Sequence, residues 1–207
     1  MSEVIVLYDG YSKMSSSNEM TANCTCSLIK GIDNIIVDSM TAWDSDKIIS
    51  GLKTHGLAPE DINYVVSTHG HSDHIGNNNL FLKAKHIVGF SISFKDKYYI
   101  FPFEKGEEYA INDSVKVIPT PGHTLSDVTV LVKSLQNENI AITGDLFEKY
   151  EDIEDSSIWL EAGSEDNIRQ LRNRSKIIDI ADWIIPGHGP KFKVTNDMRQ
   201  IVRKQVV

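Results

Sequence analysis

The 207-residue sequence has few cysteines, an excess of negative charge and no long apolar segment. It carries 21 lysines and arginines against 29 aspartates and glutamates, for a net charge of -8. A membrane-spanning helix needs roughly 20 apolar residues, and a secretory leader needs a basic start followed by an apolar stretch. Neither pattern is found, so we expect a soluble cytoplasmic protein with no membrane partner; the nucleus is the second compartment to consider.

The two cysteines, Cys24 and Cys26, are two residues apart in a segment that we expect to be a strand. Side chains at this spacing lie about 7 Å apart on one face of a strand, which is too far for a disulfide. A cysteine metal site usually needs four clustered nitrogen or sulfur ligands. We therefore predict two free, buried strand residues, as in a protein of a reducing compartment.

The negative charge argues against a broadly basic surface that binds nucleic acid through phosphates. It does not exclude a local basic rim, and the candidates for one are close in sequence: Arg169, Arg172, Arg174, Lys176, Lys191 and Lys193. The simpler interpretation is that these residues solvate an exposed helix face and a loop. The acidic segment 148–157 is likewise expected to be a solvated loop, although its position after Asp145 would suit a substrate-facing loop.

Short β-rich runs alternate with helical patterns along the chain, which predicts an α/β protein. Strands are expected at 4–8, 26–29, 35–38, 64–68, 86–90, 115–118, 128–133, 139–143 and 183–186. One helix is predicted between a capping Asp44 and Gly56, and another after a capping Ser164. With 41% apolar residues and no evident linker, we expect one domain over residues 1–207.

The most informative motif is THGHSDH at residues 68–74, directly after an apolar strand. It places four side chains able to bind a metal within six residues: His69, His71, Asp73 and His74. A single histidine in a core is more often a structural residue than a ligand, but four such side chains together reverse that interpretation. His55, before the helix-ending Gly56, and His86, at the start of a strand, are predicted to be structural.

Three further candidate ligands also follow predicted strands. His123 in TPGHT and His188 in IPGHGP each follow a Pro-Gly pair, and Asp145 in ITGD follows the strand at 139–143. A tight turn at these positions can expose a side chain at a strand end. We therefore expect all seven side chains to meet at one rim.

In this order, the H-x-H-x-D-H motif, a later histidine, an aspartate and a final histidine resemble the signature of the metallo-β-lactamase superfamily. Further segments resemble one group of members within this superfamily: IGN at 75–77, Asp127 with Val128, GDLFE at 144–148 and PGHGPKFKV at 186–194. The resemblance covers nearly the whole chain. It implies an αβ/βα sandwich of four layers with a metal site at one edge.

The same resemblance implies a role for each candidate ligand. His69, His71 and His123 would hold a first metal ion, Asp73, His74 and His188 would hold a second, and Asp145 would bridge them. Imidazole and carboxylate ligands without thiolates favour Zn²⁺, with Mn²⁺ or iron as alternatives. Two such cations lower the pKa of a shared water to about 7, so the expected nucleophile is a metal-bound hydroxide.

The charges of this expected site favour an anionic substrate. Two divalent cations, Asp73, Asp145 and one hydroxide together leave a charge near +1, which attracts an anion and stabilises charge developing on oxygen. Asp73, as a ligand beside the hydroxide, is the candidate catalytic residue that orients it or accepts its proton.

Within the superfamily, the sequence is most similar to members associated with endonucleolytic processing of histone pre-mRNA. This resemblance implies a phosphodiesterase or endoribonuclease that acts on RNA such as histone pre-mRNA. Single-stranded RNA would then need an open groove to reach the site, and a second subunit of a homodimer could complete that groove. A thioesterase similar to hydroxyacylglutathione hydrolase is the first alternative. An iron-dependent persulfide dioxygenase and a non-catalytic metal-binding protein also remain open.

Overall fold

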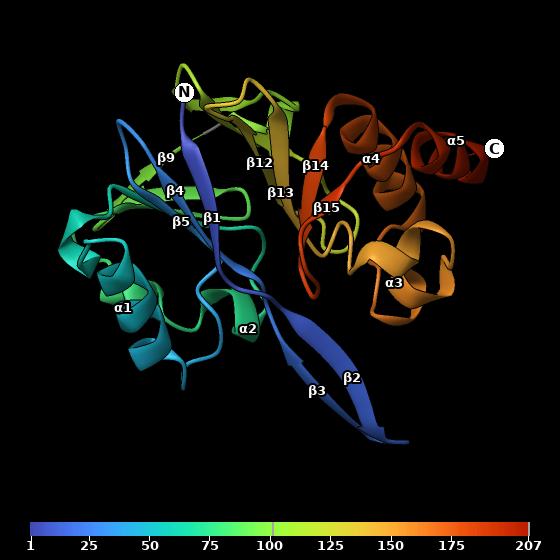
Figure 1. Cartoon of the computed structure of the whole chain (residues 1–207), viewed down its shortest axis with the longest axis horizontal. Coiled ribbons are helices and arrows are strands. Elements are labelled where there is room, and N and C mark those ends of the chain that lie inside the picture. Colours follow the sequence, from blue (N-terminus) through green and yellow to red (C-terminus); the bar gives the residue numbers. More distant parts are fainter. Residues whose placement is uncertain (101, 207) are drawn as a thin grey trace.

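Two β-sheets lie between outer helices in the computed structural model of this chain, which describes residues 1–100 and 102–206. Figure 1 shows the sheets facing each other, with α1 (Ser45–Thr54) outside the first and α4 (Asn167–Ile180) outside the second. The first sheet contains, in spatial order, β1 (Glu3–Tyr8), β4 (Cys26–Lys30), β5 (Ile35–Val37), β6 (Tyr64–Ser67), β7 (Lys85–Val88), β8 (Ser91–Phe94) and β9 (Lys97–Tyr99). The second contains β10 (Tyr109–Asn112), β11 (Val115–Pro119), β12 (Val128–Lys133), β13 (Asn139–Gly144), β14 (Trp183–Pro186) and β15 (Phe192–Lys193).

The alternation of side chains along the strands explains the layers. In β12, Val130 and Val132 point into the cluster between the two sheets, whereas Leu131 packs toward α4 and the other helices on that side. In β4, Ile29 joins the cluster between the sheets and Leu28 joins the cluster under α1. Both faces of each sheet are therefore covered, and the predicted four-layer αβ/βα sandwich is confirmed. Cys24 and Cys26 are free and fully buried, as predicted, although Cys24 lies just before its strand.

The two predicted helices form, but their caps differ from those predicted. Asp44 precedes α1 without capping it, because its carboxylate binds Thr41, Asn23 and Lys47 instead. The prediction that Ser164 caps the second helix is wrong. The side chain of Asp166 accepts the hydrogen bond from the Arg169 amide, so α4 begins two residues later than expected.

Several elements were not predicted from the pattern. A separate hairpin of β2 (Tyr11–Ser16) and β3 (Glu19–Asn23) extends beyond the sheets (Figure 1). The other short helices are α2 (Ser72–Ile75), α3 (Ser157–Glu161), α5 (Asn196–Gln205) and the 3-10 helices η1 (Pro59–Asp61), η2 (Asn78–Leu80), η3 (Phe103–Lys105) and η4 (Tyr150–Ile153). Within residues 1–100 and 102–206, no helix has the length and apolar character needed to cross a bilayer.

Candidate metal centre

The THGHSDH motif forms the end of β6 and the start of α2. His69 follows the strand and is fully buried, while His71 sits at the N-cap of α2 and is exposed to the pocket. The single turn of α2 then carries Asp73 and turns His74 back into the protein, where it is fully buried. The helical turn is therefore what separates the last two candidate ligands from the first two.

The second sheet supplies the other three candidate ligands from the ends of its strands. His123 follows β11, Asp145 follows β13 and His188 follows β14. Because β13 and β14 are parallel neighbours, Asp145 and His188 leave the sheet at the same edge. Gly187 has no side chain to block this approach: a Cβ there would overlap the Asp145 carboxylate.

Three histidines and Asp145 form the first group of facing atoms. His71 Nδ1 lies 2.8 Å from His69 Nε2 and 3.1 Å from His123 Nε2. Asp145 Oδ2 lies 3.6 Å from His69 Nε2 and 3.3 Å from His123 Nε2. Nitrogens bound to one tetrahedral zinc at its usual bond lengths would lie about 3.3 Å apart, so these four side chains fit a metal ion.

Asp73, His74 and His188 form the second group. Asp73 Oδ2 lies 3.8 Å from the Nε2 atoms of both histidines. Asp145 reaches this group as well, because its Oδ1 is 3.2 Å from His74 Nε2 and its Oδ2 is 3.3 Å from His188 Nε2. The donor atoms within each group lie within 4.8 Å of one another. The structure thus brings together all seven side chains selected from the sequence, with Asp145 between the groups.

The outer nitrogens of the buried histidines are held by oxygen atoms. His123 Nδ1 lies 2.7 Å from the Gly163 carbonyl, and His188 Nδ1 lies 3.0 Å from the Asn23 carbonyl. A carbonyl only accepts, so each Nδ1 carries a proton and each Nε2 is left as the nitrogen that can bind a metal. This tautomer is the one that binds a metal.

Asp38 performs the same task for the THGHSDH segment, and it was not selected as a functional residue from the sequence. Its carboxylate lies 3.0 Å from His74 Nδ1 and accepts hydrogen bonds from the amide and the hydroxyl of Thr68. Thr68 Oγ1 in turn lies 3.2 Å from His69 Nδ1. Asp38 lies buried at the end of β5 with φ of 58°. Its carboxylate therefore orients His74 directly and His69 through Thr68.

Two side chains of α4 hold the segment that follows Asp145. Gln170 donates to the Asp145 carbonyl at 3.0 Å, and Arg174 donates to the Leu146 carbonyl at 2.8 Å and to the carboxylate of Asp152. Arg174 is fully buried, so it neither solvates an exposed helix face, as the simpler interpretation had it, nor belongs to a basic rim. The prediction of a solvated acidic loop is also wrong for Asp152, which is fully buried.

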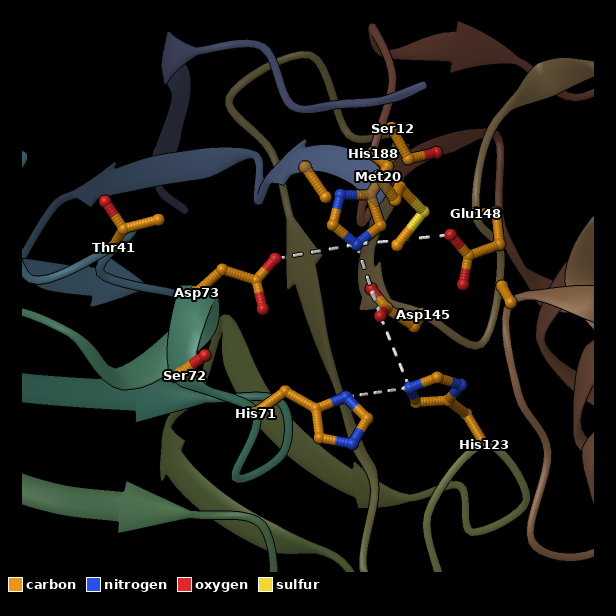
Figure 2. Close-up of a pocket in the computed structure, with 12 residues that line it drawn as sticks. Ser12, Met20, Thr41, His71, Ser72, Asp73, His123, Asp145, Glu148 and His188 are labelled. Carbon is orange, nitrogen blue, oxygen red and sulfur yellow. Dashed lines mark hydrogen bonds and ion pairs between the residues drawn. The ribbon is translucent and has the colours of Figure 1, made fainter. Parts of the chain in front are cut away.

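Glu148 is a further buried carboxylate near the centre, and the sequence interpretation had assigned it to the solvated loop. It is 2% exposed, and its Oε2 lies 4.0 Å from His188 Nε2. Figure 2 shows Asp73, Asp145 and Glu148 approaching His188 from different sides. The only sequence signal for Glu148 was its place in GDLFE, directly after an apolar pair.

Burial and charge act against each other on the pKa values of this cluster. Burial would raise the pKa of Asp145, but the facing histidines, His74 first, hold it well below its usual range. Burial would lower the pKa of His188, but Asp145 raises it to about 9. Burial, aided by Asp145, raises the pKa of Glu148 well above its ordinary value. Without a metal, the negative charge of Asp145 is therefore balanced by protons on the neighbouring histidines. A bound cation would displace those protons and balance the charge in their place.

A pocket of about 280 Å³ opens onto the cluster (Figure 2). It is lined by Ser12, Met20, Ala22, Thr41, His71, Ser72, Asp73, His123, Asp145, Glu148, Ala162 and His188. Its described lining contains no lysine or arginine, so the basic residues considered as a rim do not line it. Lys191 and Lys193 instead lie over the ring of Trp183, at 4.5 and 5.8 Å from its centroid, and Arg169 pairs with Asp166.

The residues present fit a pair of cations. His74 Nε2 and Asp145 Oδ1 are buried, face each other and have no hydrogen-bond partner, which is costly unless a cation satisfies them. His86, by contrast, lies outside the cluster with its Nε2 3.0 Å from the Phe81 carbonyl. The candidate centre therefore suits divalent metals, as expected from the sequence.

The chain belongs to the metallo-β-lactamase superfamily, whose family model matches residues 21–188. Metallo-β-lactamase domain-containing protein 1 of Xenopus laevis is 38% identical over 193 residues, which cover 92% of this chain and 81% of that protein. The human protein of the same name is 37% identical over 168 residues, and the match spans 80% of this chain but 62% of the human protein. Among solved structures, a metallo-β-lactamase-like protein of Thermotoga maritima has a TM-score of 0.69 and 22% identity, covering 93% of this chain and 99% of that one.

These comparisons confirm the family suggested by the motifs and the fold that it implies. The superfamily comprises metal-dependent hydrolases, and this chain carries its candidate metal-binding side chains.

Proposed function

We propose that this protein is a binuclear metal-dependent hydrolase that cleaves phosphodiester bonds in single-stranded RNA. The observation that carries the metal-dependent part is the convergence of seven donor side chains, from the ends of four strands and from α2, on one pocket. In the proposed assignment, His69, His71 and His123 hold one cation, Asp73, His74 and His188 hold the other, and Asp145 bridges them.

Two divalent cations, most simply zinc, would activate a shared water and polarise the bond that is cleaved. Asp73 is proposed to orient the attacking water and to accept its proton. Its side chain is 20% exposed and lines the pocket, so one carboxylate oxygen can face the histidines while the other remains accessible. Asp38 would keep His74 oriented directly, and His69 through Thr68, throughout the reaction.

The RNA part of the proposal rests on the resemblance in GDLFE and PGHGP and on the accessible pocket. The segment between Asp145 and His188 contains η4, α3, α4 and β14; β14 is a strand of the second sheet, and Ile177 and Ile178 of α4 pack on that sheet. It therefore does not form a separate cap over the pocket, and a polymer can reach the centre. A phosphodiester supplies the anionic group that the paired cations would bind.

The test is cleavage of single-stranded RNA by purified, zinc-loaded protein. Asp145→Ala should remove cleavage without unfolding the domain, because the proposed bridge is lost. Glu154→Ala, an exposed acid on the following segment, is the matched control and should cleave like the wild type. Absence of RNA cleavage together with rapid thioester hydrolysis would contradict the RNA assignment.

A thioester substrate is the second candidate, and the composition of the pocket favours it. Met20, Ala22 and Ala162 provide an apolar wall beside the cluster, and the described lining lacks the cationic side chains that usually contact phosphates. S-acyl glutathione and a β-lactam should therefore be assayed beside RNA on the same sample. The metal content of that sample distinguishes a hydrolase from a persulfide dioxygenase, because the dioxygenase would require iron.

Two further expectations can be tested with the same preparation. A folded His69→Ala variant that loses all hydrolysis would contradict a purely metal-binding role. Light scattering on the eluting protein would test the proposed homodimer.

A further inference from the structure

Glu148 is a buried acid that the proposed ligand assignment leaves without a role. Its carboxylate reaches the pocket, but its Oε1 is buried and has no hydrogen-bond partner. Among the described residues its only ion-pair partner is His188, at 4.0 Å from Oε2. An ionised carboxylate that is buried without a compensating charge is costly, so Glu148 can ionise here only with a cation beside it.

The backbone of Glu148 is fixed in a way that keeps the side chain directed at the centre. Its amide donates to Asp152 Oδ2 at 2.6 Å, and its carbonyl accepts a hydrogen bond from the His188 amide at 2.8 Å. Asp152 is in turn held by Arg174 from α4. Glu148 is thus built into the same framework as His188, and its orientation is not that of a surface side chain.

The geometry groups Glu148 with two donors that are already assigned. Donor atoms of Asp145, Glu148 and His188 all lie within 4.8 Å of one another. The same limit holds within each of the two groups of candidate ligands described above. Glu148 Oε2, 4.0 Å from His188 Nε2, borders a centre that also contains His74 Nε2, a buried nitrogen without a hydrogen-bond partner. A cation held by Asp145, Glu148 and His188 would compensate the charge of the Glu148 carboxylate.

We propose that Glu148 is a further carboxylate ligand of the cation held by His74 and His188, an inference that rests on the proposed binuclear centre. The two positions then differ in chemistry. The first is surrounded by three imidazoles and one carboxylate, whereas the second has two imidazoles and three carboxylates: Asp73, Asp145 and Glu148.

This difference predicts two different metal preferences. A nitrogen-rich, tetrahedral set suits zinc, whereas a larger and more oxygen-rich set suits manganese or ferrous iron. The second position should therefore prefer Mn²⁺ more strongly than the first does. With Glu148 ionised, the charge of the centre with two cations and one hydroxide falls from near +1 to near zero, so the extra ligand weakens its attraction for anions.

The test is calorimetric titration of metal-free full-length protein with Zn²⁺ and then Mn²⁺, with bound Mn²⁺ also counted by its electron paramagnetic resonance signal. The variant is Glu148→Gln, which keeps the shape but removes the charge. The matched control is Glu151→Gln, which removes the same charge from an exposed position three residues away. Glu148→Ala, followed in the same way, provides a second variant if the glutamine is not accommodated.

The wild type and Glu151→Gln should bind one Zn²⁺ and one Mn²⁺. Glu148→Gln should bind the first Zn²⁺ normally and lose at least about tenfold in Mn²⁺ affinity. Its metal-free form should melt no lower than the wild type, because glutamine replaces a carboxyl group whose ionised form burial disfavours, while its gain in melting temperature on adding Mn²⁺ should be smaller.

Unchanged Mn²⁺ affinity in a folded Glu148→Gln protein that binds two cations would overturn this inference and leave the proposed hydrolase intact. A wild-type protein that binds no second cation would overturn both. The two failures are therefore distinguished without measuring activity.

Discussion

Arg174 binds Asp152 through both ends of its guanidinium group, with Nη1 at 3.0 Å from one carboxylate oxygen and Nη2 at 2.7 Å from the other. Both side chains are fully buried, and the guanidinium also lies 4.2 Å from the ring centroid of Phe147. Because Asp152 accepts the Glu148 amide, this ion pair connects α4 to the segment that leaves the candidate metal centre.

Loss of Arg174 should destabilise the protein strongly. Arg174→Met leaves Asp152 charged, buried and unpaired, and such a change costs about 3–5 kcal/mol. The free energy of unfolding from urea denaturation provides the measurement. Arg172→Met, on the exposed side of the same helix, is the control and should change little. Equal stability of the two variants would show that the pair contributes no such support.

A methyl group at Gly187 should disrupt the centre. The added Cβ in Gly187→Ala would overlap the Asp145 carboxylate, so this side chain must move away from the histidines. We expect loss of bound metal, measured by elemental analysis after dialysis. In Gly70→Ala the added Cβ meets no atom within 4 Å, so that variant should retain its metal. Full metal content in Gly187→Ala would argue against the bridging position of Asp145.

The stability of the metal-free protein should fall as the pH rises from 6.5 to 9. The pKa of His188 is raised from 6.5 to about 9 against burial, chiefly by Asp145, and the side chain also faces Asp73 and Glu148. A group with a raised pKa stabilises the fold below its ordinary pKa and loses this contribution through the folded value. The metal-loaded protein needs neutral imidazoles and should not show this loss.

Thermal melts across this range, with and without a chelator, check the prediction. The chelated protein should lose melting temperature toward pH 9 while the loaded protein does not. A melting temperature that rises with pH in the chelated protein would contradict the proposed charge balance around His188.

The two cysteines should be unreactive in the folded protein. Both side chains are fully buried, and burial, aided by Asp38, raises the pKa of each thiol well above its ordinary value. Little thiolate is then present to react. Ellman's reagent at pH 8 should detect no fast thiol in the native protein and two in guanidinium chloride. A fast native reaction would contradict this burial.

The seven candidate ligands were predictable because each can be recognised from the residues next to it in the sequence. His69, His71, Asp73 and His74 lie in one motif, and His123, Asp145 and His188 each follow a strand that its apolar residues identify. The end of a strand in an α/β sheet is a position where side chains from distant segments converge. Residue type and position in the chain therefore indicated the centre before its distances were known.

The residues that orient and extend the centre were not predictable in this way. Asp38 looks like an ordinary strand end, and Glu148 lies at the start of an acidic segment whose composition is typical of a solvated loop. Arg174 lies among other basic residues, and only the fold places Asp152 beneath it. The hairpin of β2 and β3 was missed because its side chains are mostly exposed and give no apolar periodicity.

The most direct test of the account is the number of metal ions bound per chain. Metal-free protein should be loaded with zinc and manganese, separated from free metal and measured by mass spectrometry, with Asp145→Ala treated identically. The account predicts two ions per chain in the wild type and a clear loss in the variant. A wild-type chain that retains no metal, or a variant that retains as much as the wild type, would contradict the binuclear centre.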